Sequence, residues 1–176
     1  MNSADATPPL PDLLAQNLSI VFCGINPGVR AASTGHHFAG RGNRFWPVLY
    51  RAGFTPELIQ PEGDRAILRY GYGLTAVVAR ATARADQLSR EEIRGSGPEF
   101  ERKIKGCAPR YLAFLGKMAF AALFDDKQPA WGPQPVKFGG AHVWILPNPS
   151  GLNRSFSFDD LVDAYRELRI TAATSP

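Results

Sequence analysis

The sequence predicts a single α/β domain: a three-layer α/β/α sandwich around a central, mainly parallel sheet of four strands. Short apolar runs alternate with amphipathic stretches along the chain, which is the pattern of repeated strand–helix units. The length of 176 residues suits one domain. No apolar run is long enough to cross a membrane. We therefore expect one domain over residues 18–176, preceded by a flexible, Pro-rich leader over residues 1–17.

The first half of this domain contains two predicted strands. Leu18–Cys23 (LSIVFC) has the continuous apolar character of a strand that is buried on both faces. A long, Gly-rich loop follows, after which Asn43 is placed to cap a helix that ends near Gly53. Residues 61–70 predict a further helix, and residues 73–78 (GLTAVV) predict the second strand.

The second half repeats the alternation. Ser89 and Glu92 have the spacing of a capping box and begin a helix. Glycine and proline over residues 95–98 are expected to interrupt this helix before it resumes to Lys105. The remaining predicted elements are a strand over residues 111–115, a helix over 117–124, a fourth strand over 142–146 and an amphipathic helix over 158–169.

Two loops that follow predicted strands are candidates for one binding site. Gly24–Gly28 (GINPG) comes directly after the first strand, and Asn148–Arg154 (NPSGLNR) comes after the fourth. Ligands of parallel α/β sheets bind beyond the carboxyl ends of the strands, where such loops meet. Taken alone, GINPG is more typical of an ordinary turn, because Asn-Pro and Pro-Gly are common turn dipeptides. For NPSGLNR the alternative is an ordinary loop with Leu152 packed into the core.

Taken together, the two loops resemble motifs of the mismatch-specific uracil and thymine DNA glycosylases, within the uracil-DNA glycosylase superfamily. Residues 35–46 (GHHFAGRGNRFW) and 73–80 (GLTAVVAR) are also similar to that family, and the resemblance extends from residue 18 to about residue 169. It implies a uracil-DNA glycosylase-like fold. It also implies a monofunctional enzyme of base excision repair, which flips uracil out of G-mismatched double-stranded DNA and hydrolyses its bond to the sugar, leaving an abasic site.

The resemblance also implies roles for individual residues of the base pocket. Asn26 matches the position that orients the attacking water, the backbone of Ile25 helps to hold the base, and Phe38 is the stacking ring. A neutral amide cannot act as a general base, so we expect modest turnover that depends on a good leaving group. If a carboxylate assists, Asp86 is the first candidate; the alternative is an exposed acid just ahead of a helix.

Small residues at the pocket wall bear on the substrate range. Ala31 and Ala32 stand where relatives limited to uracil tend to have a serine, which leaves room for a 5-methyl group. Thymine in G·T pairs is therefore a further candidate substrate, and the sequence leaves ethenocytosine open as another. His36 and His37 are candidates for polarising a pyrimidine carbonyl, or else form a surface pair. We expect no metal, because no third ligand accompanies them, and no cofactor.

The second motif implies contacts with the DNA duplex. Leu152 fits an apolar wedge that fills the gap left by the flipped nucleotide. Gly151 and Asn153 would offer backbone and amide groups to the orphaned guanine, favouring G·U and G·T pairs, although some relatives have serine at position 153. Arg154 is expected to hold a phosphate or to be an ordinary surface arginine.

The charge pattern is consistent with a DNA partner. The net charge is +4, and acidic residues are absent between Asp12 and Glu57 and between Asp126 and Asp159, the two stretches that contain the motifs. Binding that depends on such basic segments weakens with salt. The basic residues within these stretches are Arg30, Arg41, Arg44, Arg51, Lys127, Lys137 and Arg154.

Other classes of protein are less consistent with the sequence. Only two cysteines are present, so the chain alone forms no four-cysteine zinc or iron–sulfur site, and Cys23 is expected to be a buried thiol. No strand is followed by GxGxxG or GxxxxGK[ST], which weakens a Rossmann or P-loop interpretation. The remaining alternative is a non-catalytic DNA- or nucleotide-binding module that uses the same pocket. We expect a monomer in the cytoplasm, without a membrane partner.

Overall fold

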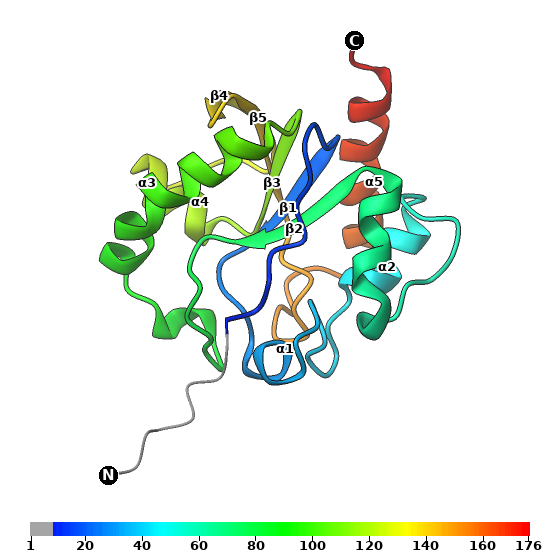
Figure 1. Cartoon of the computed structure of the whole chain (residues 1–176), viewed down its shortest axis with the longest axis horizontal. Helices are drawn as coiled ribbons and strands as arrows, with labels where there is room; N and C mark the ends of the chain where they lie inside the picture. Colours follow the sequence, from blue (N-terminus) through cyan, green and yellow to red (C-terminus); the bar gives the residue numbers. More distant parts are fainter. Residues whose placement is uncertain (1–8) are drawn as a thin grey trace.

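The computed structural model describes residues 9–176 and shows a central five-stranded sheet between two layers of helices (Figure 1). The strand order is β2-β1-β3-β5-β4, and neighbouring strands are parallel except for β4, which runs antiparallel to β5. This confirms the predicted mixed α/β fold. The strands are β1 (Ile20–Gly24), β2 (Tyr72–Ala76), β3 (Tyr111–Leu115), β4 (Gly132–Phe138) and β5 (Ala141–Leu146).

The prediction of four strands was one short, because β4 carries two prolines. Pro133 and Pro135 argue against a central strand, since proline cannot donate a ladder hydrogen bond. Within the described part of the chain, β4 pairs only with β5 and forms an edge of the sheet, where proline is tolerated.

The helices cover the sheet in two layers, each with its own buried apolar cluster (Figure 1). One layer holds α2 (Phe45–Arg51), the 3₁₀ segment η1 (Pro61–Tyr70) and α5 (Phe158–Thr174), and the other holds α3 (Arg90–Cys107) and α4 (Met118–Phe124). The short elements α1 (Val29–Thr34) and η2 (Ala85–Gln87) lie in the loops after β1 and β2. Within residues 9–176, no helix combines the length and apolar character needed to cross a bilayer.

The predicted cap at Ser89 was confirmed, the N-cap of α2 is Arg44 and not Asn43, and the predicted break in α3 was wrong. The Ser89 hydroxyl accepts the N–H of Glu92 at 3.0 Å, and the Asn43 side chain accepts the N–H of Phe45 at 2.9 Å. The α3 helix continues through Pro98. Gly97 packs so closely on α4 that an added Cβ would lie 3.0 Å from a Leu123 methyl group. Tertiary packing thus overrides the weak helix propensity of this segment.

The predicted flexible leader was too long. Residues 9–17 include Leu13, which is buried and pairs with Leu74 of β2 through two backbone hydrogen bonds of 2.9 and 2.8 Å. Burial of one leucine and this pairing fix the segment against the sheet. Residues 1–8, the rest of the predicted leader, lie outside the described residues.

Candidate functional site

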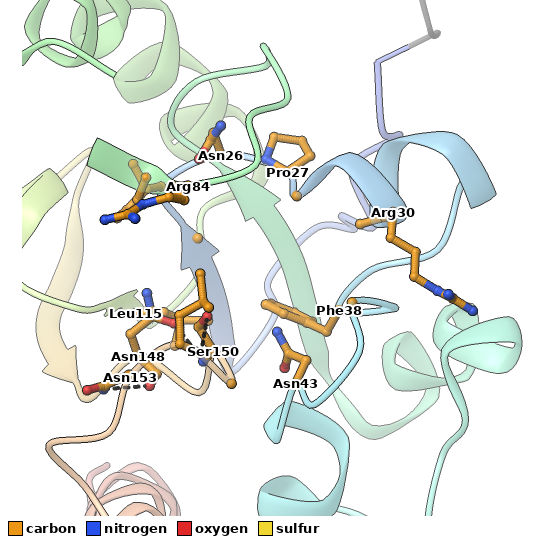
Figure 2. Close-up of a pocket in the computed structure, with 18 of the residues that line it drawn as sticks. Asn26, Pro27, Arg30, Phe38, Asn43, Arg84, Leu115, Asn148, Ser150 and Asn153 are labelled. Carbon is orange, nitrogen blue, oxygen red and sulfur yellow. Dashed lines mark hydrogen bonds between the residues drawn. The ribbon is translucent and has the colours of Figure 1, made fainter. Parts of the chain in front are cut away.

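A pocket of about 770 Å³ lies beyond the carboxyl ends of the parallel strands. The structure brings the two predicted loops together here, as expected for a sheet of this topology. Figure 2 shows Asn26 and Pro27 from the first loop on one side of the pocket, and Asn148, Ser150 and Asn153 from the second on another. Its walls are formed mainly by residues 24–31, 37–44, 82–85 and 148–154.

Backbone pairing fixes the position of the GINPG segment. Three N–H groups from residues 77–82 donate to carbonyl oxygens of residues 24–27, at 3.1, 2.9 and 3.1 Å. Gly28 and Thr82 also form a parallel bridge. The segment therefore continues the pairing of β1 with β2 beyond the regular sheet, and Asn26 lies on rigid backbone.

The Asn26 side chain is oriented by two acceptors. Its amide nitrogen donates to the Arg80 carbonyl oxygen and to the Thr82 hydroxyl oxygen, both at 2.8 Å. Because both amide hydrogens are bound, Oδ1 is the group left to accept a further hydrogen bond, and no group within residues 9–176 donates to it. The amide can therefore present an acceptor to a molecule in the pocket. Sequence reasoning missed Thr82.

The loop that holds Asn26 is itself braced. The Arg80 guanidinium donates to both carboxylate oxygens of Glu92, each at 2.8 Å. These hydrogen bonds lower the pKa of the Glu92 carboxyl and raise that of Arg80. The bidentate contact joins the loop after β2 to the first turn of α3 and fixes the backbone that carries the Arg80 carbonyl.

Phe38 provides an aromatic wall. Its half-buried ring stacks on Phe45 with centroids 3.9 Å apart and an angle of 23° between the planes. In Figure 2 the ring projects toward the middle of the pocket. Phe38 has a φ of +57°, which is unusual for a residue with a side chain. Strained backbone of this kind persists where the surroundings hold it, frequently at functional sites.

The two histidines before Phe38 have different environments. His37 is 6% exposed, so the predicted surface pair was wrong for this residue. Its N–H donates to Asp64 at 2.9 Å, its ring Nε2 lies 2.7 Å from the Pro11 carbonyl oxygen, and its carbonyl accepts from Trp46 at 3.0 Å. Burial lowers the pKa of the His37 ring. His36 Nδ1 lies 3.8 Å from an Asp64 carboxylate oxygen.

Small and apolar residues complete the pocket wall. Ile25 and Ala31 line it, and both are buried. Ala32 is buried as well but does not line it. At Ala31 the pocket wall therefore carries only a methyl group.

The 148–154 loop exposes the apolar side chain of Leu152, and hydrogen bonds within the loop hold the residues on either side of it. Leu152 is 72% exposed. The Asn148 carboxamide oxygen accepts the N–H of Ser150 at 2.9 Å, and the Asn153 amide nitrogen donates to the Asn148 carbonyl at 2.9 Å. The Asn153 side chain therefore stabilises the loop, while the neighbouring Arg154 is exposed.

Arg44 joins the two sides of the pocket, which sequence reasoning did not foresee. Its guanidinium donates to the carbonyl oxygens of Phe156, Asn153 and Ser150 at 2.8, 2.7 and 3.2 Å. Its backbone N–H donates to the Pro149 carbonyl at 3.0 Å. The only sequence signal was its position in an acid-free stretch.

The pocket carries positive charge. Among residues 9–176, no aspartate or glutamate lines it. Asp86 is not brought to the pocket: it is exposed and pairs with Arg84 at 2.6 Å. Within the same residues, no three His, Cys, Asp or Glu side chains cluster as metal ligands would. The arginines that line the pocket are Arg30, Arg41, Arg44, Arg84 and Arg154.

Comparison with known proteins connects this site to a family. The fold is similar to the solution NMR structure of a "putative Uracil DNA glycosylase" from Methanosarcina acetivorans, with a TM-score of 0.61 and 22% sequence identity over 93% of this chain and 98% of that chain. Residues 11–169 match the model of the Uracil DNA glycosylase superfamily. Since that match includes both pocket loops and nearly all of the domain, the chain belongs to the uracil DNA glycosylase superfamily.

Proposed function

We propose that this protein is a monofunctional DNA glycosylase that excises uracil from G-mismatched double-stranded DNA and leaves an abasic site. Membership of the superfamily supports DNA glycosylase activity in general, which is hydrolysis of N-glycosyl bonds. The observation that carries the proposal is the oriented amide of Asn26 in a pocket that also presents the Phe38 ring. This combination suits a flipped base and a water molecule better than it suits a simple binding surface.

The chemistry follows from the charge that develops as the bond breaks. Cleavage of the base–sugar bond builds positive charge on the sugar and negative charge on the departing base. The Asn26 Oδ1 would accept a hydrogen bond from a water molecule and hold it beside the sugar. The neighbouring arginines favour the departing anion, because their field stabilises negative charge. No carboxylate in the described pocket removes the water proton, so the rate depends on the leaving group.

The pocket wall supports a substrate range wider than uracil. Phe38 would stack on the flipped pyrimidine, and the methyl group of Ala31 leaves space near it. We therefore propose thymine and ethenocytosine as slower substrates. Release of uracil without any release of thymine from matched G·U and G·T duplexes over long incubation would overturn this part of the proposal.

The second loop supports action on duplex DNA. The exposed Leu152 would enter the base stack as the nucleotide leaves it, and the backbone of Gly151 would face the orphaned guanine. Arg154 would contact a phosphate at the rim. Because the Asn153 amide is bonded within the loop, we assign opposite-base contacts mainly to backbone groups.

The direct test uses a labelled duplex with a single U·G pair, followed by alkali to cut at abasic sites. We expect cleavage by the wild-type protein, unchanged by EDTA, and strong loss in Asn26→Ala. Gln128→Ala, which alters an exposed amide that does not line the pocket, serves as the control. Binding without base release by the wild type would instead support the non-catalytic binding module.

A further inference from the structure

The 148–154 loop rests directly on the backbone of residues 40–44. A Cβ added at Gly151 would lie 2.8 Å from the Gly42 carbonyl oxygen and 3.0 Å from its carbonyl carbon. Real Cβ atoms do not approach backbone so closely, so any larger residue at position 151 must push the two segments apart. Glycine at this position therefore allows a close backbone contact between the loop that carries Leu152 and the segment after Phe38.

Arg44 supplies the polar part of the same contact. Its guanidinium reaches carbonyl oxygens of Ser150, Asn153 and Phe156, which lie on both sides of Leu152 along the chain. Among residues 9–176, no carboxylate pairs with this guanidinium. The loop carbonyls are therefore its partners, and hydrogen bonds from a charged donor are stronger than neutral ones.

The same short segment also supports the base platform. Arg44 immediately precedes Phe45, whose ring stacks on Phe38. The Arg44 carbonyl accepts the N–H of Val48 at 2.9 Å and so belongs to the first turn of α2. The start of α2 thus holds the exposed loop through Arg44 and the aromatic wall of the pocket through the next residue, Phe45.

We propose that Arg44 is a positioning residue that locks the 148–154 loop to the base pocket, so that Leu152 enters the DNA stack in register with the flipped base. This inference rests on the proposed function and deepens it. Lysine cannot replace Arg44 in this role, because a single ammonium nitrogen does not span three separated carbonyl oxygens as a planar guanidinium does.

The experiment measures insertion of the loop into the base stack separately from cleavage of the base–sugar bond. A duplex with a U·G pair and 2-aminopurine beside the uracil is mixed rapidly with protein, and the fluorescence rise on unstacking is timed along with uracil release. We expect Arg44→Gln and Arg44→Lys to slow the rise by about tenfold, as for loss of a coupled network. Arg69→Gln, which removes an exposed arginine of η1 outside the pocket, should leave the rise unchanged.

Gly151→Ala tests the same contact from the opposite side. It leaves Arg44 in place and forces the loop off Gly42, so the fluorescence rise should slow as in Arg44→Gln. This variant also carries the test if Arg44→Gln fails to fold. The double variant Arg44→Gln/Leu152→Ala should slow the fluorescence rise little more than Leu152→Ala alone does, because both changes act on insertion of the same loop.

The outcomes separate this inference from the proposed function. A normal fluorescence rise in Arg44→Lys would overturn the role of Arg44. Strictly multiplicative effects of the two substitutions on the rate of that rise in the double variant would do the same. In either case, uracil release by the wild-type protein would still support the proposed function. A wild-type protein that raises the fluorescence but never releases uracil would contradict the function instead. Slow insertion in both Arg44 variants and in Gly151→Ala supports the locking role.

Discussion

The amide nitrogen of Asn26 and the hydroxyl oxygen of Thr82 lie 2.8 Å apart in a hydrogen bond that determines which way the Asn26 amide faces. The Thr82 hydroxyl gives its own hydrogen to the Arg84 carbonyl, also at 2.8 Å, so its oxygen acts as an acceptor toward Asn26. A hydroxyl group remote in sequence thus orients the amide that we propose to hold the water.

Thr82→Val should reduce catalysis without unfolding the protein. Valine has nearly the same shape as threonine, but it leaves one Asn26 amide hydrogen unbound and frees the amide to rotate. Loss of one hydrogen bond is worth about 1 kcal/mol, so the single-turnover rate on U·G duplex should fall by roughly fivefold to tenfold. The KM should change little, because Thr82 is buried and its hydroxyl is already bonded to Asn26 and to the Arg84 carbonyl.

Thr82→Ser is the matched control, since it retains the hydroxyl. Its rate should remain close to that of the wild type. Equal rates for Thr82→Val and the wild type would show that Asn26 is oriented by the Arg80 carbonyl alone.

Leu152→Ala should separate stability from activity. Because Leu152 is 72% exposed, its truncation should change the free energy of unfolding by less than about 0.5 kcal/mol. Excision from duplex U·G should nevertheless fall, since no apolar group then fills the gap in the base stack. Urea unfolding and single-turnover excision measure the two effects.

Leu58→Ala provides a matched truncation, because Leu58 is also an exposed leucine, at 45%, and does not line the pocket. It should leave excision unchanged. If both truncations reduced excision equally, the assignment of Leu152 as the wedge would be wrong.

The sequence predicted the parallel strands and the two pocket loops because both depend on local patterns. Apolar runs such as Leu18–Cys23 indicate a buried strand directly. The loops that follow such parallel strands lie at the same edge of the sheet, where ligands bind. The edge strand β4 was missed, because Pro133 and Pro135 argue against a strand. They are tolerated in β4 because its outer edge forms no hydrogen bonds with a further strand among the described residues. Length and charge gave no hint of it.

The contacts that orient the site could not be predicted in the same way. Arg44 and Thr82 act through partners more than fifty residues away, as their hydrogen bonds to the 148–156 region and to Asn26 show. Many of these partners are backbone carbonyls, which every residue possesses, so no residue pattern marks them. Asp86 is the reverse case. Its position after the second strand suggested a catalytic role, but in the structure it is exposed and forms an ion pair with Arg84.

Phe38→Leu should weaken binding of the flipped base. Stacking of a base on an aromatic ring contributes about 1–3 kcal/mol, so the KM for U·G duplex should rise by roughly fivefold or more. Affinity for duplex containing an abasic site, which presents no base to the ring, should change far less. Phe38→Tyr keeps the ring and is the control; equal losses for uracil-containing and abasic duplex would count against a stacking role.

Stability should depend on pH through His37. Burial places the pKa of its ring below the 6.5 of a free histidine, so the unfolded chain binds a proton at a pH where the folded protein does not. The free energy of unfolding should therefore fall as pH drops through about 6.5, until the folded pKa is reached. In urea unfolding, His37→Gln should reduce this fall, whereas His142→Gln, at an exposed histidine, should retain it.

Salt dependence should report the DNA-facing arginines one at a time. Each DNA phosphate that a protein Lys or Arg neutralises adds about 0.9 to the magnitude of the slope when the logarithm of the binding constant is plotted against the logarithm of the salt concentration. Arg154 is exposed at the pocket rim, so Arg154→Gln should weaken binding of all duplexes alike and reduce the slope by about 1. Arg102→Gln removes an exposed arginine of α3 that does not line the pocket, and its slope should equal that of the wild type. A parallel reduction in both variants would mean that the charge of the whole protein, and not a phosphate contact at Arg154, sets the salt dependence.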